Sequence, residues 1–304
     1  MLAFTIRRVV LAAIVAFAVS IVGFGLLRLS GDPAVAMAGP SGTSADIAHI
    51  RHEYGFDKPL PVQYWNWMRR AVSGNLGDSY YFRMPVTTML EQRLPITLTL
   101  GVCALVFALV LSLPLGVLAA LRPNSWMDRV ALTLSVVGQA LPSFWFGLML
   151  IVLLGVMFPI LPPSGSGSWQ HFVMPTIVLG YYATPAFMRL TRTGMLEVLQ
   201  SDYIRTARAK GLPRWRVVLK HALRNAIIPV VSLAAVQFGF MLGGSIIVET
   251  VFGLGGAGYL AWESISRADF PTVQAIVLVY SGFYIVLTLL ADLANAWLDP
   301  RMRG

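Results

Sequence analysis

Charged residues are scarce in this chain. They make up 12% of its 304 residues, whereas 57% of the residues are hydrophobic. A soluble domain of this length carries about twice that charged fraction. The apolar residues are gathered into uncharged stretches such as 96–121 and 272–291, long enough to cross the hydrocarbon core of a membrane as a helix. The composition therefore excludes a soluble globular fold and predicts an integral membrane protein.

Cysteine and the common catalytic motifs are also nearly absent. The single cysteine, Cys103, lies inside an apolar stretch, so neither a disulfide framework nor a thiolate metal cluster is expected. The sequence contains no Gly-x-x-x-x-Gly-Lys-Ser/Thr, His-Glu-x-x-His or Gly-x-Ser-x-Gly, and its four histidines lack ligand spacing. Residues 253–258 match the Gly-x-Gly-x-x-Gly pattern, but they follow an apolar helix rather than a strand, which favours a glycine-rich turn. We expect no catalytic site, metal or cofactor in this chain.

Hydropathy predicts six transmembrane helices, at about residues 9–29, 96–121, 131–158, 172–190, 225–248 and 271–298. The fourth is the weakest because it is short and contains Pro175 and Pro185, although membrane helices tolerate proline. A cleaved signal peptide is the alternative for the first. Its apolar stretch exceeds the ~7–15 residues of a signal core, so we expect a retained helix.

Lysine and arginine predict the orientation of these helices. With both termini in the cytoplasm, the cytoplasmic segments hold 15 of the 23 lysines and arginines and few of the acidic residues. This asymmetry follows the positive-inside rule. The net charge of +9 is thus explained by membrane topology, and no nucleic-acid partner is expected.

The topology divides the chain into three parts. Residues 1–30 form the N-terminal tail and first helix, residues 31–95 form an extracytoplasmic segment, and residues 96–304 form a five-helix core with a cytoplasmic loop at 191–224. The extracytoplasmic segment mixes tryptophan and tyrosine with charged residues, which favours an ordered, lid-like element over a linker.

The cytoplasmic loop contains local signals for a short helix over residues 202–210. Ser201 can cap its first amides, Gly211 can adopt the left-handed conformation that closes it, and Pro213 prevents its continuation. A second helix is predicted next, with an apolar stripe (Trp215, Val218, Leu219, Ala222, Leu223, Ala226) backed by Arg216, Lys220 and Arg224. Such a helix suits the membrane interface. The loop can serve either as a lipid anchor or as a knob that docks into another protein.

The loop resembles a known family. Arg205-Thr206-Ala207-x-x-x-Gly211 is similar to the Glu-Ala-Ala-x-x-x-Gly loop of permeases in binding-protein-dependent ATP-binding-cassette (ABC) importers. Residues 202–211 and 221–229 look like the branch of this family that imports dipeptides, oligopeptides, nickel and glutathione. Two departures from the general pattern are expected of this branch: Arg205 replaces the glutamate, and Pro229 lies further from Gly211 than usual. Residues 31–33, 54–60, 74–79 and 238–249 resemble the same branch, and residues 169–175 are most similar to glutathione permeases.

The resemblance implies an all-α type I ABC-importer permease fold in the bacterial cytoplasmic (inner) membrane. Such a permease forms half of a pore with a second homologous permease subunit. Two ABC ATPase subunits bind ATP and Mg²⁺ beneath it, and an extracytoplasmic substrate-binding protein delivers the ligand. The lid-like segment is expected either to meet this binding protein or to close the outer mouth of the pore. The ATPase-coupling residues that the resemblance implies are Asp202, Tyr203, Arg205, Thr206, Ala207, Gly211 and Leu212. The implied substrate is a small peptide (a dipeptide, an oligopeptide or glutathione), with nickel chelates and sugars left open.

Polar residues inside the predicted helices are candidates for the translocation pathway: Ser135, Gln139, Ser143, Ser232, Gln237 and Ser245. Hydrogen bonds between helices, worth ~0.6 kcal/mol each, are the simpler explanation. Asp292 is expected to pair with a basic residue. A stand-alone secondary transporter or channel is the alternative function. It would favour paired charges at mid-membrane or an internal repeat, and the sequence has neither.

Overall fold

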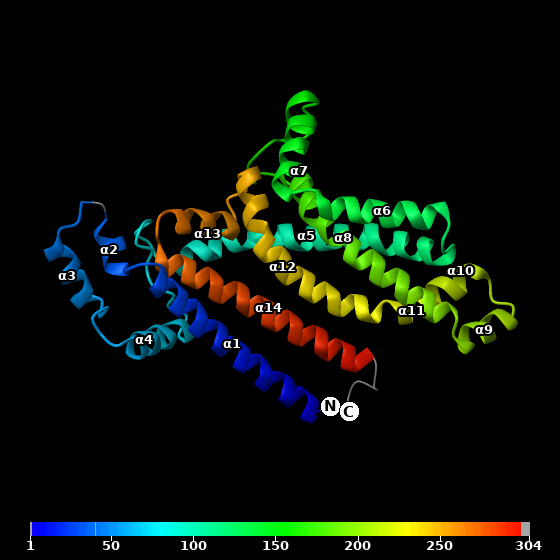
Figure 1. The fold of residues 1–304 in the computed structure, drawn as a ribbon, viewed down its shortest axis with the longest axis horizontal. Helices are drawn as coiled ribbons and strands as arrows, with labels where there is room; N and C mark the ends of the chain where they lie inside the picture. Colours follow the sequence, from blue (N-terminus) through cyan, green and yellow to red (C-terminus); the bar gives the residue numbers. More distant parts are fainter. Residues whose placement is uncertain (1, 40, 299–304) are drawn as a thin grey trace.

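The computed structural model describes residues 2–39 and 41–298, and this part of the chain is helical apart from its loops and one isolated β-bridge, between Asp78 and Pro85 (Figure 1). The all-α prediction is therefore confirmed. The elements are, in order, α1 (Leu2–Ser30), α2 (Pro33–Ala38), α3 (Ser44–Glu53), α4 (Leu60–Val72), α5 (Val86–Leu121), α6 (Trp126–Ala140), α7 (Ser143–Leu150), the π-helix η1 (Ile151–Met157), α8 (Gln170–Leu199), α9 (Asp202–Ala209), α10 (Arg214–Arg216), the π-helix η2 (Val217–Ala222), α11 (Leu223–Ala226), α12 (Ile228–Phe252), α13 (Ala257–Ser266) and α14 (Phe270–Leu298).

Four helices of the described chain are long and apolar enough to cross a membrane. They include Thr5–Leu26 of α1, all of α5, all of α12, and Phe270–Ala294 of α14. Helix α5 begins at Val86 rather than at residue 96, and Pro95 lies inside it without ending it. The end of the predicted extracytoplasmic segment, at residue 95, therefore falls within a helix.

The third predicted membrane helix, over residues 131–158, is not one helix. Helix α6 ends at Ala140, Leu141 has an extended backbone (φ −80°, ψ 126°), and α7 begins only at Ser143. The cause is Pro142, because proline disfavours the helical conformation of the residue before it. Helix α6 runs beside α5 and α8, whereas α7 takes a different direction from α6 and packs on α8 and α12 (Figure 1).

The fourth predicted helix forms part of α8, which keeps both of its prolines in its interior and continues beyond residue 190. Helix α8 packs along α5, and glycine permits the close approach. A Cβ atom at Gly180 would lie 2.5 Å from the carbonyl oxygen of Ala104, and one at Gly116 would lie 2.8 Å from that of Met188. The largest buried cluster, which includes Leu100 and Phe187, lies between these two helices and α12.

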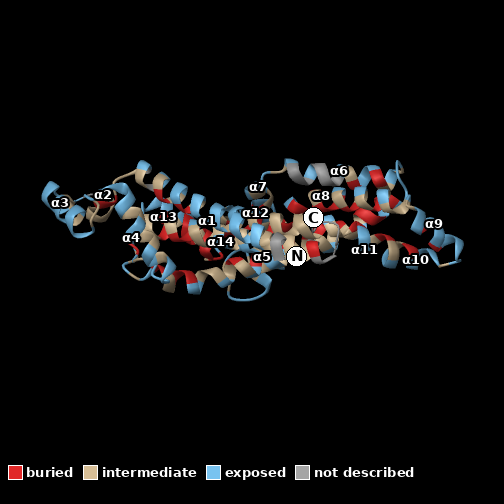
Figure 2. Cartoon of the chain, turned by 90° about the horizontal axis from the view of Figure 1, so that it is seen from below, coloured by how far each residue is buried: buried red, intermediate tan, exposed pale blue. Residues whose placement is uncertain are grey.

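Helices α1 and α14 lie side by side, with the start of α1 near the end of α14 (Figure 1). Arg8 Nη1 lies 2.8 Å from Asp292 Oδ2, so the predicted pairing of Asp292 with a basic residue is confirmed. Many apolar side chains of α1 are exposed, as expected of a helix surrounded by lipid. Figure 2 shows that buried residues run through the middle of the molecule, while α3 and α9 at its two ends are mostly exposed.

Residues 31–39 and 41–85 form helices α2 to α4 and a closing loop, at the end of the molecule opposite α9 (Figure 1). Asp269, which is fully buried before α14, anchors this loop because it accepts hydrogen bonds from Ser79 Oγ (2.6 Å) and from the backbone N of Tyr80 (2.9 Å). The Tyr64 and Trp67 rings of α4 pack on Phe24 of α1. The segment is folded against the core at both of its ends, while its role as a lid stays a prediction.

Candidate coupling site

Helix α9 begins and ends where the local sequence signals predict. Gly211 has φ +74°, its N–H donates to Arg208 O (2.9 Å), and the Leu212 N–H donates to Ala207 O (3.4 Å). These two bonds are those of the Schellman motif, which closes a helix through a left-handed glycine. The predicted side-chain cap at the other end is wrong, because Ser201 Oγ donates to Val198 O (2.6 Å) and makes no bond to α9.

One face of α9 is fixed against the rest of the molecule. Ile204 and Ala207 are buried in a cluster with Met195 of α8, Val217 of η2 and Val117 of α5. Leu212 packs half-buried against the same cluster. Ala207 and Leu212 were predicted to contact a partner protein. The structure turns Ala207 inward, where it is 7% exposed, and its coupling role stays a prediction.

The opposite face of α9 is exposed and polar. It carries Asp202, Tyr203, Arg205 and Thr206 from the predicted site, together with Arg208, Ala209 and Lys210. Asp202 and Arg205 form an exposed ion pair at 3.2 Å. Such a pair contributes little stability, so these side chains are free to exchange partners when another protein approaches.

Tyr203 connects α9 to the following helices. Its hydroxyl accepts a hydrogen bond from Asn225 Nδ2 at 2.6 Å, although the tyrosine is 43% exposed. Because Asn225 lies on α11, which leads directly into α12, this bond links the exposed face of α9 to a helix long enough to cross the membrane.

The second predicted helix of the loop has a different register from the expected one. The π-helix η2 places Val217 and Ala222, five residues apart, on its buried face, which an α-helical stripe does not do. Trp215 and Leu219 were predicted to share the apolar stripe, but they are 61% and 55% exposed. The stripe is thus divided between buried Ala222 and Ala226 and exposed Trp215 and Leu219, and its location at the membrane interface stays a prediction. Its two exposed members still adjoin basic Arg216, as expected of residues at a membrane interface.

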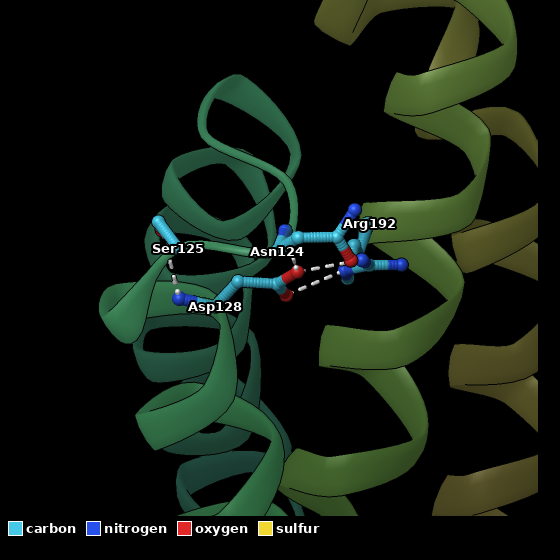
Figure 3. A network of polar contacts seen from close by, with 4 residues as sticks. All are labelled: Asn124, Ser125, Asp128 and Arg192. Atoms are coloured by element: carbon cyan, nitrogen blue, oxygen red, sulfur yellow. Dashed lines mark hydrogen bonds and ion pairs between the residues drawn. The ribbon is translucent and has the colours of Figure 1, made fainter.

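An ion pair that the sequence did not reveal joins α6 to α8 one turn before Met195. Arg192 Nε and Nη2 donate to the two carboxylate oxygens of Asp128, each at 2.7 Å (Figure 3). The N–H of Asn124 donates to Asp128 Oδ2 (2.9 Å), and Ser125 Oγ accepts from the N–H of Asp128 (3.3 Å). Chiefly because of the hydrogen bonds from Arg192, the pKa of Asp128 lies below its usual range. The pair holds the turn between α5 and α6 beside the base of the coupling region.

A second feature that the sequence did not reveal is the fully buried Glu249 near the end of α12. Its carboxylate accepts hydrogen bonds from Thr97 Oγ1 (2.7 Å) and from the backbone N of Tyr259 (2.9 Å). The glycine-rich turn at 253–258 wraps around it, and a Cβ atom at Gly258 would come within 3.0 Å of the carboxylate. The prediction that this motif is a turn is confirmed. The available signal was an acidic residue between an apolar stretch and a glycine-rich turn.

The candidate pathway residues whose side chains the structure describes lie on α7 and α12. Ser245 is fully buried and its hydroxyl donates to Leu242 O (2.8 Å), and its pathway role stays a prediction. Ser143, Ser232 and Gln237 are half-buried, and their role stays a prediction. Ser135 and Gln139 lie outside the side chains that the structure describes.

Comparisons with known proteins agree with the resemblance. The family described as binding-protein-dependent transport system inner membrane component matches residues 112–304, and the family described as the N-terminal part of such a membrane component matches residues 1–101. The glutathione transport system permease protein GsiC of Escherichia coli (strain K12) is 40% identical over 304 residues, which cover 100% of this chain and 99% of that protein. The GsiC protein of Pectobacterium atrosepticum is 41% identical over 275 residues, 90% of each chain.

Solved structures support the same fold. A chain of the inward-facing MetNI methionine ABC transporter, in its native crystal form, matches with a TM-score of 0.55 at 20% sequence identity. The match covers 69% of this chain and 96% of that chain. A second crystal form of the same transporter gives a TM-score of 0.58 with the same coverage.

Proposed function

Because the chain belongs to the family of binding-protein-dependent transport system inner membrane components, we propose that it forms half of the translocation pathway of an importer for small peptides. The chain is a permease subunit of an ABC importer and a multi-pass protein of the bacterial cytoplasmic membrane. The peptide substrate, with glutathione as the first candidate, is proposed because the curated relatives at 40–41% identity are named glutathione permeases.

The observation that carries the coupling role is the two-sided character of α9. Its inner face packs against α5, α8 and η2, so a force on α9 is transmitted to the long helices. Its outer face is polar, exposed and closed by a left-handed glycine. We propose that this outer face docks into an ATPase subunit. The lipid-anchor alternative is better supported for Trp215 and Leu219, which are apolar and exposed.

The finer architecture is also a proposal. We propose six membrane crossings with both termini in the cytoplasm, the third contributed by α6 with α7 and η1, and the fourth by α8. Two features support this arrangement: the start of α1 lies near the end of α14, and α9 and α2–α4 lie at opposite ends of the molecule (Figure 1). A second homologous permease subunit would complete the pore, lined in part by Ser143, Ser232 and Gln237. Two ATPase subunits would supply ATP hydrolysis with Mg²⁺, so this chain itself would be non-catalytic and free of cofactors.

Uptake by reconstituted vesicles tests the proposed function. Vesicles that contain this chain, the second permease, the ATPase subunits and the binding protein are expected to accumulate labelled glutathione only when ATP is supplied on the ATPase side. Uptake that needs no ATPase subunit and follows an ion gradient would instead establish the alternative, a secondary transporter.

A further inference from the structure

A cavity of about 660 Å³ lies at the end of the molecule opposite α9. Its wall combines the end of α1, the turn between α3 and α4, α4 itself, the loop that follows it and the start of α14. This volume lies within the range of roughly 300–1,000 Å³ typical of small-molecule sites. The cavity is separate from the coupling site and from the proposed pathway residues.

The cavity wall has an excess of positive charge. Arg28, Lys58, Arg70 and Arg83 line it, against only Glu53 and Asp78 among acidic residues. Within the described chain, no carboxylate lies within ion-pair distance of any of these four cations, whereas Glu53 Oε2 lies 3.6 Å from His49 Nε2. Unpaired guanidinium groups bind carboxylates through two parallel hydrogen bonds. The wall is therefore suited to a ligand with more carboxylates than ammonium groups.

Other groups on the wall suit a peptide. Asn66 and Gln274 present side-chain amides, which can donate to and accept from peptide groups. Trp67 presents an aromatic ring, and Tyr80 presents a hydroxyl that is neutral at physiological pH and can donate a hydrogen bond. The segment that carries Tyr80 is anchored to the buried Asp269, so this part of the wall is held in place.

We propose that this cavity is a binding site for a small, net-negative peptide, of which glutathione is the test case. The proposal rests on the proposed function as a peptide importer. The two exposed guanidinium groups, Arg70 and Arg83, would hold the peptide carboxylates, and Glu53 or Asp78 would receive its ammonium group. Under the proposed topology the cavity faces the extracytoplasmic side, where the permease would hold the peptide after its release from the binding protein.

Calorimetric titration of reduced glutathione into the assembled importer, without binding protein and without nucleotide, tests the proposal. We expect saturable binding to one site per copy of this chain. Arg70→Gln, or Arg83→Asn, should weaken it about tenfold or more, because each removes a charge-assisted pair. Asparagine is chosen at position 83 because the backbone there is left-handed (φ +56°), which asparagine tolerates. Arg69→Gln is the matched control, since Arg69 is exposed on the same helix but does not line the cavity.

A comparison of two ligands on the wild-type importer tests the proposal even if the variants assemble poorly. Glutathione diethyl ester, which lacks both carboxylates, should bind at least tenfold more weakly to the wild-type importer. Absence of glutathione binding, equal binding of the ester, or binding unchanged in both cavity variants would each overturn the proposal. Displacement of glutathione by short-chain phosphatidylglycerol but not by acidic dipeptides would overturn it in favour of a lipid-phosphate site. ATP-driven uptake of glutathione with no such binding would leave the proposed function intact and remove only this site.

Discussion

Replacement of Gly211 by valine should uncouple the importer while leaving this chain folded. Gly211 has φ +74°, and a Cβ atom built there meets no other atom within 4 Å. The internal cost is therefore limited to the left-handed backbone, roughly 1–2 kcal/mol for a residue with a side chain. Such a cost shifts the local turn equilibrium by roughly 5- to 30-fold but does not disturb the buried face of α9. We expect normal membrane insertion and thermal stability close to that of the wild type.

The effect on coupling should be larger than the effect on stability. If the exposed turn docks into an ATPase subunit, a valine side chain would both bend the turn and fill the interface. ATP hydrolysis by the reconstituted importer should then no longer respond to loaded binding protein, and ATP-driven uptake should be lost. Gly211→Asn is the matched control for backbone strain, because asparagine adopts the left-handed conformation at lower cost. A Gly211→Val importer that transports at the wild-type rate would refute the docking of this turn.

Three further predictions follow from the same structure. With the native cysteine replaced, a cysteine at Ser44 should react with an impermeant thiol reagent in intact cells and one at Ser125 only after permeabilisation; the reverse pattern would contradict the proposed topology. Ala207→Asp should lower the amount of folded protein, because it places a carboxylate in an apolar cluster at a cost of roughly 3 kcal/mol; wild-type thermal stability would show that this face is not buried in the importer. Asp128→Asn should destabilise the importer by about 2–3 kcal/mol at pH 7. Because the pKa of Asp128 is lowered in the folded state, Asp128 contributes stability that is fully present above the usual carboxyl pKa of about 4 and is lost as pH falls through the folded pKa. The melting temperature of the variant should therefore fall less on acidification than that of the wild type. Equal falls would contradict the role of the Arg192 pair.

Local chemistry made α9 predictable from the sequence. Its first-turn acid, its closing glycine and Pro213 lie within 12 residues of one another, and each acts on the backbone next to it. The inward orientation of Ala207 was not predictable in the same way. It depends on Met195 and Val217, which the fold brings to the same cluster.

The π-helix and the broken third helix show where periodicity fails. An i, i+3, i+4 pattern assumes an α-helical register. Helix η2 instead buries two residues that are five positions apart, and it packs against α9. In the third predicted helix, Pro142 was visible in the sequence, but the long uncharged stretch around it hid the break. Hydropathy reports which residues avoid water and does not report whether their backbone is continuous.

Long-range polar contacts are the largest omission. Asp128 and Arg192 are 64 residues apart. In the sequence, neither residue differs from the other charged residues of the predicted cytoplasmic segments. Thr97 and Glu249 are separated by 152 residues. Only the packing of α6 against α8 and of α5 against α12 brings these groups together, so no local pattern could pair them.

Cross-linking from α9 tests the central claim most directly. A single cysteine at Thr206, on the exposed face of α9, can carry a short photoreactive cross-linker in the assembled importer after the native cysteine is replaced. The account predicts a product that contains this chain and an ATPase subunit, whereas the same label at Ser44, at the opposite end of the molecule, should give no such product. If the ATPase subunit were labelled from Ser44 and not from Thr206, the assignment of α9 as the coupling helix would be wrong.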